Sequence, residues 1–211
     1  KVLAIQSLRD SQDPDQAVVL LQGQVSKTNA LKVKERAIVV LAQIDAPKAH
    51  QALLGYAKGG GNPDLQRTAI RYLGTSRNQK TTSAELIEIY NSTTDTDIRS
   101  SVISAFRSAG DKTSLMRIAS GSAFGGDRPA IVGTDNSATY ALAAGLANRA
   151  KAITSLTDLA SPQELWPLYQ KEENKDLRSQ WVSAFSGMGA VDQLLQIVKT
   201  EKDPAVKNKA I

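Results

Sequence analysis

The sequence predicts an all-α protein, folded as a right-handed α-solenoid (superhelix) of stacked antiparallel helical hairpins. The first observation is a recurring string: NPDLQRTAIRYLG at 62–74, TDTDIRSSVISAF at 94–106 and NKDLRSQWVSAFSG at 174–187. The second is its regular spacing, since Ala37, Ala69 and Val102 follow one another at nearly equal intervals. One copy cannot cover its own apolar face, so successive copies are expected to stack on each other.

The apolar residues of each string form one stripe along a helix. Their offsets of 0, 4, 5 and 8 along the chain place them on the same side of an α-helix. Each stripe starts next to an acid, Asp64, Asp97 or Asp176, which we expect to accept hydrogen bonds from free backbone N–H groups. The stripes are Leu65/Ala69/Ile70/Leu73, Ile98/Val102/Ile103/Phe106 and Leu177/Trp181/Val182/Phe185. The glycines expected to reverse the chain after them are Gly74, Gly110 and Gly187.

A second, leucine-rich stripe precedes each of these helices. Leu53 precedes Ala69 by the same interval as Leu86 precedes Val102. The repeating unit is therefore a hairpin, in which a first helix with a leucine face leads through a turn into a second helix. The first-helix leucines expected in the core are Leu20, Leu53, Leu86, Leu115, Leu165 and Leu194.

The predicted array occupies the chain as one domain, with one irregular repeat. Its parts are a half-repeat at 1–12, repeats at 13–45, 46–77, 78–110, 111–160 and 161–189, and a half-repeat at 190–211.

The repeat at 111–160 is long, because the interval from Leu115 to Leu165 is much wider than the interval from Leu165 to Leu194. We expect an inserted loop at 121–136, followed by a second-helix stripe at Ala138, Leu142, Ala143 and Leu146. Because half-repeats leave apolar faces open, we also expect flanking repeats or a further domain in a longer protein.

The unit resembles a HEAT repeat, an armadillo-type helical repeat, of the short bacterial kind. That pattern opens D-[LI]-x-R or D-[LI]-R and continues as A-[IV]-x-x-[LF]. Here it stands as Asp64-Leu65-Gln66-Arg67, Asp97-Ile98-Arg99 and Asp176-Leu177-Arg178. The resemblance implies that second helices line a concave surface, and it implies roles that range from protein scaffolding to chromophore attachment and nucleic-acid binding. Ankyrin and tetratricopeptide repeats fit less well, because T-P-L-H and W-x-x-L-G strings are missing.

Few residues offer catalytic or metal chemistry. The chain has no cysteine, which excludes a cysteine nucleophile. Its one histidine, His50, cannot form the usual zinc site without cysteine ligands. The glycine clusters lack the Lys-Ser/Thr pair of a phosphate loop. No apolar run approaches the roughly 20 residues of a membrane span, and Lys1–Leu8 lacks a signal-peptide pattern. We therefore predict no catalytic residue, metal ligand or cofactor; the compartment stays open.

Arginines and one tryptophan are the candidate binding residues. Arg67, Arg71 and Arg107 fall on second helices, where a basic groove could take an acidic peptide or a phosphate backbone. Trp166 follows a core leucine and could anchor a partner or pack in the core. Four further residues are expected to form a structural ladder, in which the acid of one repeat pairs with the arginine of a neighbour: Asp97, Arg99, Asp176 and Arg178.

The predicted function is a non-enzymatic scaffold that binds a protein or peptide on the concave face of the second helices. The alternative is a nucleic-acid-binding HEAT-like protein, with DNA-repair activity as one form of it. The net charge of +5 and the arginines favour this alternative, while the acids interspersed among them oppose it. A third role, assistance in chromophore attachment, has no residue that selects it.

Overall fold

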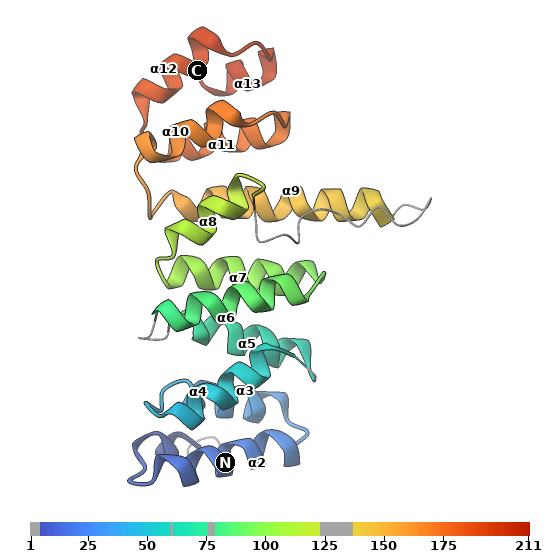
Figure 1. The fold of residues 1–211 in the computed structure, drawn as a ribbon, viewed down its shortest axis with the longest axis vertical. Coiled ribbons are helices and arrows are strands. Elements are labelled where there is room, and N and C mark those ends of the chain that lie inside the picture. Colours follow the sequence, from blue (N-terminus) through green and yellow to red (C-terminus); the bar gives the residue numbers. More distant parts are fainter. Residues whose placement is uncertain (1–4, 60, 76–78, 123–136) are drawn as a thin grey trace. The chain divides into compact units, whose positions relative to one another are not determined.

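The structure, a computed structural model, describes residues 5–59, 61–75, 79–122 and 137–211. All regular secondary structure in these residues is helical, which confirms the all-α prediction (Figure 1). The chain divides into two compact units, unit 1 (Lys1–Ala109) and unit 2 (Gly110–Ile211).

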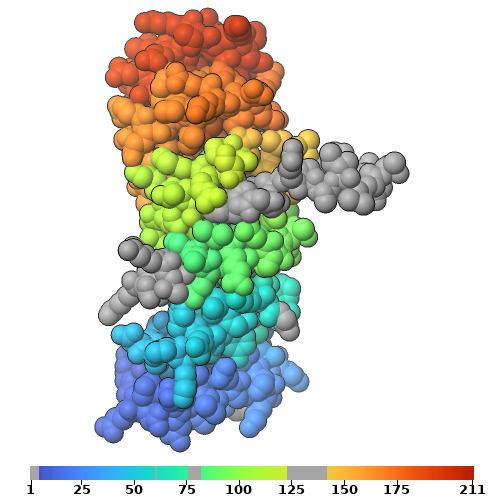
Figure 2. Space-filling model, viewed as in Figure 1, coloured from blue at the N-terminus to red at the C-terminus, as the bar shows by residue number. Residues whose placement is uncertain are grey.

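Unit 1 is built from hairpins whose helices form two layers. Its helices are the 3-10 helix η1 (Ser7–Asp10) and the α-helices α2 (Pro14–Lys27), α3 (Leu31–Leu41), α4 (Pro47–Ala57), α5 (Pro63–Leu73), α6 (Gln79–Ser92) and α7 (Thr96–Ser108). The first helices α2, α4 and α6 pair with the second helices α3, α5 and α7, and α5 packs against both α3 and α7. The hairpins follow one another as successive bands from blue to green in Figure 2.

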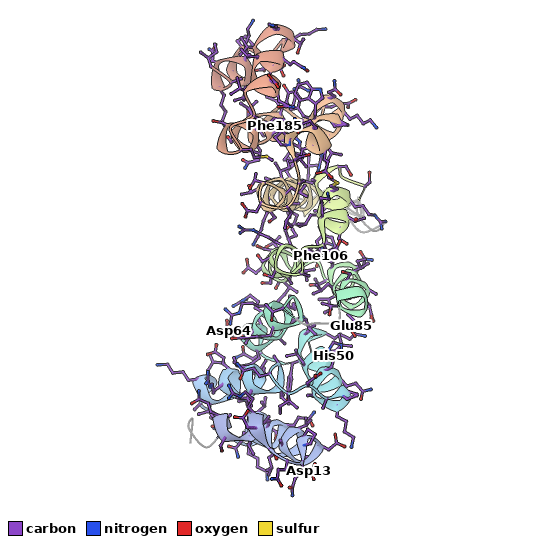
Figure 3. The ribbon with its side chains drawn as sticks, turned by 90° about the vertical axis from the view of Figure 1, so that its left-hand side faces the viewer. Asp13, His50, Asp64, Glu85, Phe106 and Phe185 are labelled. Carbon is purple, nitrogen blue, oxygen red and sulfur yellow. The ribbon has the colours of Figure 1, made fainter. Side chains whose placement is uncertain are left out.

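Contacts between polar and charged side chains join neighbouring first helices of unit 1. Figure 3 shows His50 of α4 and Glu85 of α6 on one side of the unit, away from Asp64 at the start of α5. The Nε2 atom of His50 lies 2.9 Å from the Glu85 carboxylate. The other pairs are Lys48 with Asp15 and Lys58 with Glu88.

Unit 2 repeats this plan. Its helices are α8 (Lys112–Ala119), α9 (Ser137–Leu156), α10 (Pro162–Lys171), α11 (Lys175–Gly187), α12 (Val191–Thr200) and α13 (Pro204–Lys209). The first helices are α8, α10 and α12, and the second helices α9, α11 and α13 pack against one another in turn. Residues 190–211, expected as a half-repeat, thus contain both helices of a hairpin.

The predicted stripes of α5, α7 and α11 lie in the core. Every one of their residues is buried, and Trp181 is fully buried, which confirms it as a packing residue. Burying one leucine or isoleucine side chain contributes about 2 kcal/mol. Because a stripe of each helix faces the next hairpin, this burial couples successive hairpins within a unit.

The residues that cap these helices lie two positions before the predicted caps. The side chains that accept backbone N–H groups are Asn62, Asp95 and Asn174, at 2.8 to 3.0 Å. The caps proposed from the sequence were wrong in register: Asp64, Asp97 and Asp176 lie inside the first turn. Their negative charge there still faces the positive end of the helix dipole.

The three predicted turn glycines have different roles. Gly110 reverses the chain as expected, with φ of 68°. Gly74 has ordinary helical angles, but a Cβ atom there would lie 2.6 Å from the Cα of Ala105, so its role is the close approach of α5 to α7. Gly187 ends α11, and Gly189 makes the turn with φ of 64°.

Two first-helix leucines do not lie where the spacing placed them. Leu20 is 49% exposed, because the buried face of α2 runs through Val18, Leu21 and Val25. Leu194 is only half-buried, and Ile197 holds the core position of α12. The other four predicted leucines are buried.

The second-helix stripe of repeat 111–160 was also wrong. Leu142 is 59% exposed, whereas the buried residues of α9 lie further along the helix than the predicted ones. Four of them keep the offsets of 0, 4, 5 and 8: Asn148, Ala152, Ile153 and Leu156. Ser155 is buried as well. The polar side chain of Asn148 at the first position obscured the pattern. The predicted insertion at 121–136 lies, from residue 123 on, outside the described residues.

Candidate binding surface on the second helices

The second helices carry polar side chains on the part of their surface that the buried stripe does not cover. The positions concerned are the sixth and the ninth residues after the first stripe residue. We call the polar residues at these positions the outward row, and each of them is exposed or half-buried. They are Arg71, Ser104 and Arg107 in unit 1 and Thr154, Thr157, Ser183 and Ser186 in unit 2. The ninth position of α5 is Gly74, which is buried and does not belong to the row.

The unit 1 part of the outward row carries positive charge. Arg71 of α5 is exposed, and its guanidinium lies 5.3 Å from the ring centroid of Tyr72. Arg107 of α7 is exposed as well. Arg67, also predicted for this surface, forms an ion pair with Asp64 on its own helix. Arg71 and Arg107 are thus the cationic members of the outward row on α5 and α7.

The unit 2 part of the outward row borders an open groove between α9 and α11. The groove encloses about 430 Å³, and its walls include Thr154, Thr157 and Asp158 on one side and Gln180 and Ser183 on the other. The Nε2 atom of Gln180 donates a hydrogen bond to Thr154 Oγ1 at 2.9 Å, which ties the two walls together. Sequence reasoning missed this groove. The available signal was the recurrence of a small hydroxyl side chain at the sixth position.

The residue after the first stripe residue caps the end of the first helix. Arg99 donates to the carbonyl of Thr93 at 2.8 Å, and Arg149 donates to that of Ala119 at 3.0 Å. A cation is favourable there because carbonyls at a helix C-terminus lack partners and carry partial negative charge. The equivalent residues are Gln66, Arg99, Arg149 and Arg178.

Two of these arginines also bind a carboxylate of the next hairpin. Arg149 forms an ion pair with Glu172, and Arg178 forms one with Glu201. Only 4% and 5% of the two glutamate side chains is exposed, so both pairs are shielded from water. The predicted ladder included Asp176 as one of its acids. In the structure, Arg178 forms its ion pair with Glu201 instead.

Arg99 and Asp97, the other members of the predicted ladder, lie at the start of α7. The Arg99 guanidinium lies 4.9 Å from the ring centroid of Tyr90, on the first helix of the same hairpin. Asp97 is exposed in the first turn. Arg99 thus contacts the first helix of its own hairpin, and it does not belong to the outward row.

Trp166 belongs to an aromatic cluster and not to the outward row. It is half-buried in α10, with ring centroids 5.2 Å from Tyr169 and 5.9 Å from Phe185, a residue labelled in Figure 3. Stacking of this kind fixes the indole against the core of its hairpin.

Within the described residues, no group of three or more His, Asp or Glu side chains is placed to hold a metal ion. The helices of that part of the chain are all too short or too polar to cross a membrane. Comparison with protein-family models gives no match, and comparison with curated protein sequences gives none.

Proposed function

We propose that this chain is a non-enzymatic scaffold that binds another protein on the outward row of its second helices. The observation that carries the proposal is the regular separation of buried and accessible positions along these helices. In α7, α9 and α11 the stripe positions are buried and, except for Asn148, apolar, whereas the sixth and ninth positions are polar and accessible. Extended, polar surfaces of this kind suit recognition of a partner segment.

We propose further that the hairpins belong to one right-handed α-solenoid of the HEAT-like kind. Recurrence of one motif supports this: the offsets of the stripe at 98–106 in unit 1 return at 148–156 and at 177–185 in unit 2. In such a fold the outward row would line the concave face, as the HEAT resemblance implies.

A pull-down from an extract of the source organism tests the scaffold, with nuclease added to one half of the sample. The test variant is Arg71→Glu/Arg107→Glu, which reverses charge on the outward row. The matched control is Lys27→Glu/Arg117→Glu, which makes the same charge change at exposed positions of first helices. One protein retained by wild type and by the control, with and without nuclease, and lost from the test variant would support the scaffold.

Two outcomes would oppose it. Retention that collapses with nuclease would favour the nucleic-acid alternative, because binding would then depend on phosphate contacts. A set of retained proteins that neither variant changes would exclude the charged part of the outward row as the binding surface.

A further inference from the structure

We draw no further inference here: the strongest candidate, the exposed apolar surface around Leu142 and Ala143 in the first half of α9, carries nothing because nothing in the structure shows what covers it.

Discussion

Arg178 and Glu201 form a shielded ion pair that fastens α11 to the loop in front of α13. The Nε atom of Arg178 donates to Glu201 Oε2 at 2.9 Å, and the Tyr169 hydroxyl donates to the same oxygen at 2.6 Å. The other oxygen of Glu201 accepts the backbone N–H of Asp203 at 3.0 Å, at the start of α13. One carboxylate therefore connects two successive hairpins.

These contacts shift the acidity of two groups. Burial acts to raise the pKa of Glu201, but hydrogen bonds from Tyr169, from the Asp203 backbone and from Arg178 outweigh it and lower the pKa from 4.5 to about 2. Burial raises the pKa of the Tyr169 hydroxyl, and its hydrogen bond to Glu201 raises it further. The Tyr169 hydroxyl therefore keeps its proton, and with it the hydrogen bond, over the ordinary pH range.

Glu201→Gln is expected to lower the free energy of unfolding by about 2 kcal/mol at pH 7, because Arg178 loses its buried counter-charge. Since the folded pKa of Glu201 lies below the unfolded value, its contribution is complete above pH 4.5 and is lost as the pH falls towards about 2. Urea unfolding at pH 7 and pH 3 measures this. The difference between wild type and variant should shrink at pH 3, and the exposed Glu173→Gln should show no such change.

Arg149→Met should destabilise unit 2 by about 3 kcal/mol, because it leaves the shielded carboxylate of Glu172 without its cation. The double variant Arg149→Met/Glu172→Gln should recover part of this loss, since the uncompensated charge is then removed. Urea unfolding of both single variants and the double variant gives the coupling free energy, expected at about 1 to 2 kcal/mol. The exposed pair Lys48 and Asp15, treated in the same way, should show much weaker coupling. Additive effects at the first pair would contradict the prediction.

Gly74→Ala should lower the free energy of unfolding by about 2 kcal/mol or more, because the new methyl would overlap the backbone of Ala105. Gly55→Ala is the matched control in the same unit. Its methyl would meet no atom within 4 Å, so greater helix propensity should stabilise α4 by up to about 1 kcal/mol. Thermal unfolding followed by circular dichroism distinguishes the two, and equal melting temperatures would rule out the close contact.

Asn148→Leu should raise the free energy of unfolding by about 1 kcal/mol, because an unpartnered buried amide is unfavourable. Asn148 is 4% exposed, and its Nδ2 atom has no hydrogen-bond partner in the part of the chain that the structure describes. The equivalent positions in α5 and α11 hold Leu65 and Leu177.

The same substitution at Asn174 is the control. Asn174 caps α11, so Asn174→Leu should instead cost about 1 kcal/mol. Urea midpoints that fall for both variants would show that Asn148 stabilises the protein.

The buried stripes could be predicted because burial requires apolar residues at fixed helical offsets. That rule located Leu65, Ile98 and Leu177 correctly, and it failed at Asn148, where a polar residue holds a buried position. Helix starts were displaced by two residues because both Asn62 and Asp64 are plausible caps; backbone geometry, which the sequence does not display, decides between them.

The candidate site was harder to predict, because its contacts join residues that lie far apart along the chain. Arg99 and Arg178 were predicted to form a ladder with Asp97 and Asp176. In the structure Arg99 donates to the Thr93 carbonyl, and Arg178 donates to the Glu172 carbonyl and to Glu201. The groove between α9 and α11 brings together Thr154 and Gln180, which lie on different helices. No local pattern in the sequence indicates this contact.

The two arginine–glutamate pairs of unit 2 have a consequence for how such a chain could change its length. The interval along the chain from Arg149 to Arg178 is the same as the interval from Glu172 to Glu201. If a segment of that length were duplicated or lost from the gene, each remaining arginine would still face a glutamate at the equivalent position of the next hairpin. A shorter deletion would leave one buried charge without its counterpart, so whole repeats are the increments by which this unit can grow or shrink.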